Sequence, residues 1–447
     1  MKETVTAIFD IGKTNKKLIL FNKDLKVISV KEHKFAEITD DDGFECDDID
    51  LIEEWIKESV SALVNSHEYD LITINFTTYG ATLVYLDAEG RRLTPVYNYL
   101  KPINERISEN LYKRHGGRDE FCRRTASPAL GMLNSGIQTL WLRSVKPEVF
   151  EKIKHILHFP QYLSYILTGK IYSEHTSIGC HTGLWDFDNM TYHPWVNEYG
   201  LSLPDPVPVD TVNEVIIGGK AVSVGIGIHD SSSSLAPYFA GTEKFLLLST
   251  GTWCINMNPF NNEILTTEQL DNDCLCYLSI ASQPVKSSRM FLGHIHEEGV
   301  KRIAEHFIKQ PDYYKKIKIN DKLTSSLRER NAGKKHFFMP SPDSRELKEF
   351  IDMYEFGSFE EAYQQLMIEL CHLTVEAIRF VLPADDDTEN IYITGGFSDN
   401  ELFKYHIKRA FPAKQVFTSE IANASALGAA LVLSGERPGL NLGLTPV

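Results

Sequence analysis

The chain has 447 residues, which exceeds the size at which single hydrophobic cores stop growing, so two domains are expected. Hydrophobic residues at 43% and charged residues at 24% are ordinary for a globular protein and exclude a disordered or fibrous chain. The net charge of -15 argues against binding to nucleic acid or an anionic membrane, which need basic patches, and leaves small molecules as the expected partners.

The first predicted element is a hairpin at residues 7–22, AIFDIGKTNKKLILFN. An apolar run stops at Asp10, turns through Gly-Lys-Thr-Asn and becomes apolar again after two lysines. Taken alone, a glycine and an asparagine at this point indicate a tight turn without further function. A second copy of the pattern would favour a functional role.

The elements that follow predict α/β organisation. Residues 25–35 read as a third strand. Residues 47–66 carry apolar side chains at helical spacing, with Asp47 or Asp48 as the cap. Residues 71–77 and 81–87 then read as strands.

The stretch 102–167 reads as mostly helical. It includes predicted helices at 135–145 and at 152–169, and the second of these stops at Gly169, as helices often do.

The same order of elements begins again after about residue 238. Residues 244–251, KFLLLSTG, form an apolar run that ends in Ser-Thr-Gly, and residues 253–258 lead away as a second strand. The remaining predicted elements are a helix at 358–382, a strand at 390–396, a helix at 400–411, a strand at 415–419 and a small-residue helix at 424–435. We therefore expect two α/β halves, residues 1–240 and 241–447, each led by a hairpin with a glycine and a hydroxyl at its tip.

The expected location is the cytoplasm. The amino terminus shows no secretion signal, and the sequence contains no apolar run of 18 residues. The seven cysteines are an odd number without framework spacing, which favours reduced thiols. Cys274 and Cys276 are interpreted as buried thiols.

The two hairpin tips are suited to phosphate. A tight glycine turn exposes backbone N–H groups, adjacent hydroxyls add donors, and two such turns across a cleft would grip a polyphosphate. Asp10 would then be a ligand for the Mg²⁺ that accompanies ATP, and Lys13 or Lys17 would supply positive charge.

Two further segments carry candidate chemistry. Asp230, in GIGIHDSSSSLAPY, could accept the proton of an attacking hydroxyl, or it could cap a helix. Residues 393–403, ITGGFSDNELF, place two glycines where a backbone passes close to a flat nucleobase or ribose. His294 and His296, in FLGHIHEEG, are interpreted as polar surface or cleft wall rather than as a metal site.

Four motifs in this order resemble the FGGY carbohydrate kinase family: FDIGKTNKKLILFN, GIHDSSSS, LLLSTGTWCINMN and ITGGFSDNELF with ASALGAALV. The resemblance runs nearly the length of the chain. It implies two ribonuclease H-like domains of the actin and sugar kinase superfamily, flanking a cleft for ATP, Mg²⁺ and a small sugar.

The resemblance also implies roles for individual residues. Asp230 is implied to be the catalytic base and Asp10 a residue near the metal. The residues expected to bind ATP and its phosphates are Gly12, Lys13, Thr14, Asn15, Lys17, Gly251, Thr252, Gly395, Gly396, Ser398 and Asn400. The residues expected on the sugar side are Thr78, Tyr79, Gly80, His229 and Asp230.

The expected substrate is a ketose, such as L-rhamnulose, L-fuculose or a pentulose. TTYGATLVYLD and HDSSSSL look like the rhamnulokinase form of the substrate-side segments. The chain departs from the family at Lys13, where many members have Thr, and at residues 96–102, VYNYLKP, where many sugar kinases have an Asp-Arg pair.

Two alternatives remain open from sequence. One is an ATPase of the same fold that acts as a conformational or filament protein, and the other is a catalytically weak sugar-binding regulator. The oligomeric state is also open, with a homodimer as one candidate.

Overall fold

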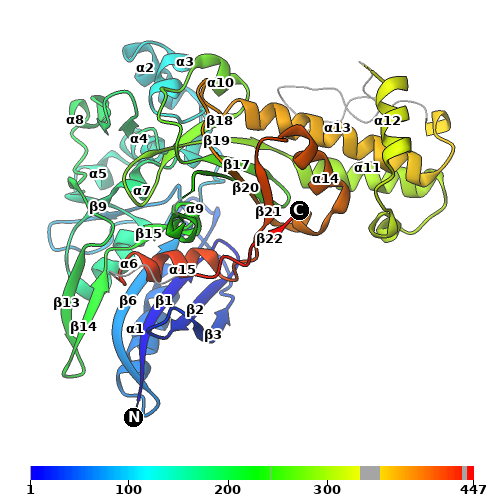
Figure 1. The fold of residues 1–447 in the computed structure, drawn as a ribbon. Coiled ribbons are helices and arrows are strands. Elements are labelled where there is room, and N and C mark those ends of the chain that lie inside the picture. The colour runs from blue at the N-terminus through cyan, green and yellow to red at the C-terminus, as the bar shows by residue number, and fades with distance from the viewer. Residues whose placement is uncertain (1, 242, 333–352, 435–439) are drawn as a thin grey trace.

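The computed structural model describes residues 2–241, 243–332, 353–434 and 440–447. Two seven-stranded sheets, each flanked by helices, form two lobes (Figure 1). The helices are α1 (Ile49–Val64), α2 (Arg106–Arg114), α3 (Arg118–Arg124), α4 (Ser135–Val145), α5 (Pro147–Phe150), α6 (Phe159–Thr168), α7 (His175–Ile178), α8 (Trp195–Glu198), α9 (Asp230–Leu235), α10 (Thr267–Asp271), α11 (Leu292–His306), α12 (Asp321–Arg330), α13 (Phe359–Arg379), α14 (Glu401–Ala410) and α15 (Ala424–Leu431). The predicted two-domain α/β fold is confirmed.

The first sheet has the strand order β13-β14-β6-β1-β2-β3, and β15 pairs with β6 beside this path. Its strands are β1 (Glu3–Ile11), β2 (Lys16–Phe21), β3 (Val27–His33), β6 (Tyr69–Thr78), β13 (Val212–Ile217), β14 (Lys220–Gly225) and β15 (Ile228–His229). β1 pairs antiparallel with β2 and parallel with β6. The hairpin predicted at residues 7–22 is therefore confirmed.

The second sheet has the order β18-β19-β17-β16-β20-β21-β22. Its strands are β16 (Phe245–Thr250), β17 (Cys254–Asn258), β18 (Cys274–Leu278), β19 (Pro284–Met290), β20 (Asn390–Gly395), β21 (Gln415–Thr418) and β22 (Thr445–Pro446). β16 pairs antiparallel with β17 and parallel with β20, which repeats the pairing of β1 with β2 and β6. The two sheets thus share one topology around their hairpins.

The central strand β1 of the first sheet is buried on both faces. Alternate residues of a strand point to opposite faces, so Ala7 and Phe9 of β1 pack in a core with α1 and α6, whereas Ile8 packs with α15. α15 comes from the end of the chain and lies across the first sheet beside α9 (Figure 1). The last helix therefore belongs structurally to the first lobe, and the domain boundary near residue 241 stays a prediction.

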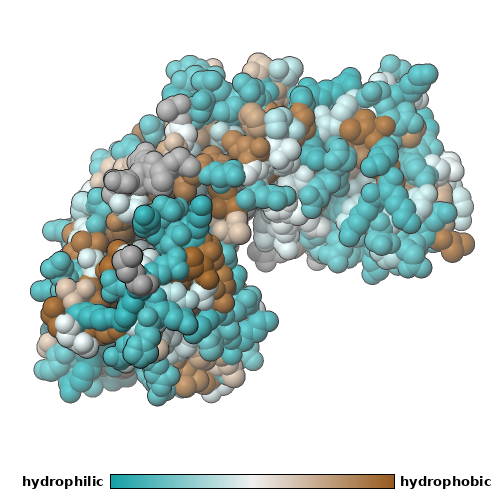
Figure 2. Space-filling model, turned by 60° about the horizontal axis from the view of Figure 1, so that its bottom comes forward, coloured by the Kyte–Doolittle hydropathy of each residue, from teal (hydrophilic) through white to brown (hydrophobic). Residues whose placement is uncertain are grey.

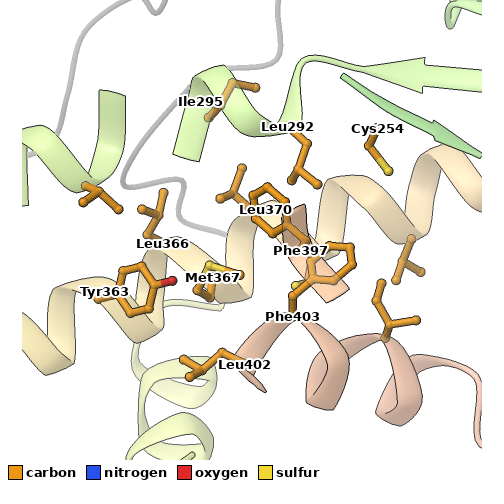
Figure 3. Close-up of a cluster of buried hydrophobic side chains, with 14 of the residues drawn as sticks. Cys254, Leu292, Ile295, Tyr363, Leu366, Met367, Leu370, Phe397, Leu402 and Phe403 are labelled. Atoms are coloured by element: carbon orange, nitrogen blue, oxygen red, sulfur yellow. The ribbon is translucent and has the colours of Figure 1, made fainter. Parts of the chain in front are cut away.

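The second lobe is built around α13. Its side chains form one core with α11, α14 and the inner face of β16, and Figure 3 shows Leu366, Met367 and Leu370 of α13 inside that cluster. Phe397 and Tyr363 lie in the same cluster (Figure 3). The helix predicted at residues 358–382 is confirmed.

The remaining strands pair in short ribbons outside the two large sheets. They are β4 (Ile38–Thr39) with β5 (Glu45–Cys46), β7 (Leu83–Leu86) with β8 (His155–His158), β9 (Ser173–Glu174) with β12 (Pro206–Val207), and β10 (Trp185–Asp186) with β11 (Thr191–Tyr192). A third core with Trp141 and Trp195 holds the helices between β7 and β13 together.

The helix predicted at 152–169 is wrong in its first part. Residues His155–His158 form β8, and α6 begins only at Phe159 before ending at Gly169, whose φ is 65°. β8 pairs with β7 over Leu83–Leu86, so a tertiary partner overrides the helical spacing of these residues.

Within the part of the chain that the structure describes, every helix is too short or too polar to span a membrane. All seven cysteines lie among the described residues and are buried free thiols, as expected for Cys274 and Cys276.

Candidate active site

The first hairpin turn joins β1 to β2 and has the tight polar form predicted. Gly12 N donates to Asn15 O at 2.9 Å, and a Cβ at Gly12 would lie 3.0 Å from the same oxygen, so the turn favours glycine. Thr14 is exposed at the tip. The buried Asn15 Oδ1 has no hydrogen-bond partner among the described residues, which leaves an acceptor for a ligand or water.

Asp10 lies one residue before the end of β1, directly opposite Lys17 in β2. Its Oδ2 accepts a hydrogen bond of 2.8 Å from Ser425 Oγ, at the start of α15. The pKa of Asp10 is raised above its usual value. Burial is the main cause and the Asp230 carboxylate adds to it, whereas the Ser425 hydrogen bond and the Lys17 ammonium lower the pKa. Asp230 and Lys17 are therefore close enough to act on Asp10 electrostatically.

Asp230 is the first residue of α9, directly after β15, with His229 at the N-cap. Its Oδ1 accepts a 3.2 Å hydrogen bond from Ser231 Oγ and lies 3.4 Å from His229 Nε2. Burial raises the pKa of Asp230 to about 6 and lowers the pKa of His229 to about 4, so the imidazole is neutral at pH 7. The Asp230 side chain is 34% exposed and remains accessible.

The sugar-side residues cluster where β6 ends. Thr78 pairs with His229 across β6 and β15, and a Cβ at Gly80 would lie 2.8 Å from His229 Nε2. Thr78, Gly80 and His229 are thus brought together beside Asp230. Tyr79 differs, because its hydroxyl donates a 2.6 Å hydrogen bond to Oδ2 of the buried Asp47.

Lys13 is held by carboxylates. Its Nζ lies 2.8 Å from Glu37 Oε1 and 3.0 Å from Asp47 Oδ2. Burial opposes the charged form, but the hydrogen bonds and charges of Glu37 and Asp47 together raise the pKa of Lys13. The positive charge of Lys13 is therefore balanced by these two carboxylates in this structure.

The second hairpin turn joins β16 to β17. Gly251 N donates to Trp253 O at 2.8 Å, and Gly293 N donates to Thr252 O at 3.0 Å. Gly251 and Thr252 are both exposed. Gly293 is needed here, since a Cβ on it would lie 2.3 Å from Gly251 O.

The Gly-Gly segment after β20 packs against this second hairpin. Gly395 has φ 84°, and a Cβ on it would lie 1.8 Å from Thr250 O, so only glycine fits. Ser398 Oγ donates to Gly395 O at 2.7 Å. Asn400 caps α14 and donates from Nδ2 to Tyr363 Oη at 2.8 Å.

A pocket of about 530 Å³ joins these two segments. Its lining residues are Gly251, His296, Tyr314, Lys315, Ile317, Lys318, Tyr363, Gly396, Phe397, Asp399, Asn400, Glu401 and Leu402. Three of the residues predicted from sequence, Gly251, Gly396 and Asn400, are therefore brought together in one cavity. Its aromatic and amide walls suit a nucleobase and ribose.

Sequence reasoning missed several pocket residues. His296 Nε2 lies 3.1 Å from Tyr363 Oη, and Tyr314 packs edge-on against the His296 ring. The expectation of polar surface is wrong for His296, which is buried and whose pKa burial lowers to about 4, whereas the cleft-wall interpretation is correct. The helical spacing of α13 gave no sign that Tyr363 faces a ligand pocket.

The site therefore consists of two groups of residues, one on each lobe. Figure 2 shows a deep notch between the lobe of the first sheet and the lobe of α11 to α14. The Asp10 carboxylate fits a hydrated Mg²⁺, because it is a hard oxygen ligand oriented by the hydrogen bond from Ser425 Oγ.

Comparisons with known proteins agree with this architecture. Residues 5–202 match the FGGY family of carbohydrate kinases, N-terminal domain. The chain is 29% identical over 228 residues to a rhamnulokinase of Yersinia pestis bv. Antiqua (strain Angola), covering 48% of this chain and 45% of that protein. It is 24% identical over 283 residues to a rhamnulokinase of Oceanobacillus iheyensis, covering 59% and 57%. Each match thus spans about half of the relative's length.

Solved structures match over nearly the whole chain. A carbohydrate kinase from Novosphingobium aromaticivorans superposes with a TM-score of 0.81 at 22% identity, covering 100% of this chain and 94% of that one. A ligand-bound xylulose kinase from Lactobacillus acidophilus gives a TM-score of 0.76 at 16% identity, covering 99% and 93%. At these identities the likeness establishes the fold.

Proposed function

We propose that the protein is an ATP-dependent kinase of a small sugar, because residues 5–202 match the model of the FGGY family of carbohydrate kinases, N-terminal domain. The observation that carries the proposal is the electrostatic interaction between Asp10, at the first hairpin, and Asp230, beside the sugar-side residues: the Asp230 carboxylate raises the pKa of Asp10. A metal-side carboxylate and a base must both lie near the transferred phosphoryl group, and the influence of these two carboxylates on each other supports that arrangement.

Asp230 acts as the general base in this proposal. Its carboxylate accepts the proton of the attacking sugar hydroxyl as that oxygen bonds to the γ-phosphorus and the bond to the β-phosphate oxygen breaks. A pKa of about 6 suits the role, because the group is ionised at neutral pH yet basic enough to accept a proton. The neutral His229 beside it leaves the charge of Asp230 uncompensated.

The nucleotide is proposed to lie across the notch. The pocket lined by Tyr314, Phe397 and Asn400 would hold the adenosine, and the two hairpin turns would hold the phosphates. Asp10 would hold Mg²⁺, which supplies charge neutralisation of the phosphates when bound. Lys17, opposite Asp10, would add positive charge on the same side.

The proposed substrate is a ketose, such as L-rhamnulose, L-fuculose or a pentulose. Support comes from the position of Thr78, Gly80 and His229 beside Asp230 and from the rhamnulokinase and xylulose kinase names of similar proteins.

Cytoplasmic location is part of the proposal, and the seven free thiols support a reducing compartment.

The test is an ATP-consumption screen with Mg²⁺ over ketoses, aldoses and polyols, with product identification by mass. We expect a deoxyketose or pentulose to give a higher kcat/KM than glycerol or glucose. A higher value on glycerol than on every ketose would overturn the substrate class. ATP hydrolysis that no sugar stimulates, together with ATP-dependent sedimentation, would favour the filament alternative instead.

A further inference from the structure

Asp47 is a buried carboxylate that contacts three separate parts of the first lobe. Its side chain is 4% exposed. In the chain, Asp47 directly precedes Asp48, the N-cap residue of α1. Asp47 Oδ1 accepts from Lys16 Nζ at 2.7 Å, and Oδ2 accepts from Lys13 Nζ at 3.0 Å and from Tyr79 Oη at 2.6 Å. One carboxylate therefore joins both sides of the first hairpin turn to the end of β6.

Lys16 makes this network rigid at the turn. Its side chain is 2% exposed, and besides Asp47 it donates to the backbone oxygen of Lys13 at 2.9 Å. Because that oxygen belongs to the turn itself, the buried ammonium fixes the main chain between Gly12 and Asn15. Tyr79 adds a second connection, since its backbone N–H donates to Ile11 O at 3.1 Å.

The network is balanced in charge. The Lys13 and Lys16 ammonium groups face the carboxylates of Glu37 and Asp47. Burial alone would raise the pKa of Asp47, but hydrogen bonds from Lys16 and Tyr79 and the charges of both lysines hold it below its usual value. Buried ion pairs stabilise a fold little, because desolvation offsets their attraction, so fixing geometry is the better account of this one.

We propose that Asp47 is a positioning residue, which through Lys16 and Tyr79 holds the phosphate-binding turn in place relative to the sugar-side end of β6. The inference rests on the proposed function, because it takes the first turn to be a phosphate site. Its consequence is that loss of the Asp47 charge weakens the binding of nucleotide phosphates without affecting the adenosine pocket on the other lobe.

The test compares ATP and adenosine binding to the full chain by calorimetry, without sugar. For Asp47→Asn we expect ATP affinity to fall about tenfold, in line with the loss of hydrogen bonds to a charged group, and adenosine affinity to stay unchanged. Asp40→Asn is the matched control. Asp40 lies in the same segment, its side chain is 0% exposed, and it accepts a 2.6 Å bond from Lys101 Nζ.

Asp40→Asn should lower the melting temperature while leaving the ratio of ATP to adenosine affinity unchanged. Tyr79→Phe serves as a second variant, because it keeps both ion pairs and decides the matter if Asp47→Asn does not fold. Tyr79→Phe should lower the affinity for ATP, by less than Asp47→Asn does, and should leave the affinity for adenosine unchanged.

The inference is overturned if folded Asp47→Asn, or Tyr79→Phe in its place, keeps the wild-type ratio of ATP affinity to adenosine affinity. It is also overturned if Asp40→Asn changes this ratio by the same amount, or if the wild type does not bind ATP. A wild type that binds ATP with the expected Asp47 dependence but phosphorylates no sugar would sink the kinase proposal and support this inference.

Discussion

Ser425 Oγ donates a hydrogen bond of 2.8 Å to Asp10 Oδ2, and the two residues are 415 positions apart in the chain. Asp10 lies near the end of the first strand of the first sheet, and Ser425 lies in the first turn of the last helix, α15. The carboxylate proposed to hold Mg²⁺ is therefore oriented by the opposite end of the chain. The packing of Ala426 and Ala429 of α15 against Ile8 fixes that orientation.

Replacing Ser425 by Ala should raise the Mg²⁺ concentration needed for half-maximal turnover. The Asp10 carboxylate loses a donor that orients it, and its pKa rises further because that hydrogen bond favours the ionised form. A shift of about threefold to tenfold is expected from the loss of one charge-assisted bond. Ser144→Ala, which removes a 2.9 Å bond to Leu140 O within α4, is the control and should leave the Mg²⁺ requirement unchanged.

Asp230→Asn should lower kcat by roughly 10² or more while ATP affinity is retained, since the amide keeps the shape but cannot accept the hydroxyl proton. Asp10→Asn should differ by raising the Mg²⁺ requirement as well as slowing the reaction. Steady-state kinetics and nucleotide titration on both folded variants separate the two roles. Near-normal turnover of Asp230→Asn would mean that the base lies elsewhere.

The pH dependence of kcat/KM should show an acidic limb near pH 6. Burial raises the pKa of Asp230 to about 6, and only the ionised form is a base, so activity falls as the pH drops below that value, about tenfold per pH unit. A profile of kcat/KM from pH 4.5 to 8 measures this limb. A limb near pH 4 would show that the carboxylate is solvated normally in the free enzyme.

Asp230→Asn should also stabilise the fold at neutral pH. The folded-state pKa of Asp230, about 6, lies above its usual value of 3.8, so the folded protein binds this proton more tightly than the unfolded chain does. The stabilising contribution is present below pH 3.8 and is lost as the pH rises through about 6. The melting temperature of the variant should therefore exceed that of the wild type at pH 7, and the difference should shrink towards pH 4.

Gly395→Ala should destabilise the second lobe. The residue has φ 84°, and the added Cβ would lie 1.8 Å from Thr250 O. The paired ends of β16 and β20 would therefore have to move apart. A loss of about 2 kcal/mol or more in the free energy of unfolding is expected from such overpacking. Gly396→Ala is the matched control, because a Cβ added there would meet nothing within 4 Å and the φ of Gly396 carries no strain, so it should cost far less in a urea titration.

Local chemistry made the hairpins and most helices predictable. The turn at Gly12 and Asn15 follows from residue type, and α1 begins where Asp48 accepts a hydrogen bond from Leu51 N, as a capping aspartate does. The repeat of a hairpin that ends in a glycine and a hydroxyl predicted two similar lobes, because turn chemistry and strand patterning act over a few residues.

Long-range packing decided what the sequence could not. β8 is a strand only because β7 pairs with it, and His296 faces the pocket only because α11 packs against Tyr363 of α13. The partners of Asp10 and Lys13 were likewise hidden, since Ser425 and Asp47 reach them from other segments of the chain. Residue type and spacing determined which groups could do chemistry, whereas the burial of helices and strands against one another determined which of those groups meet, because side-chain contacts between distant segments leave no local periodic signal.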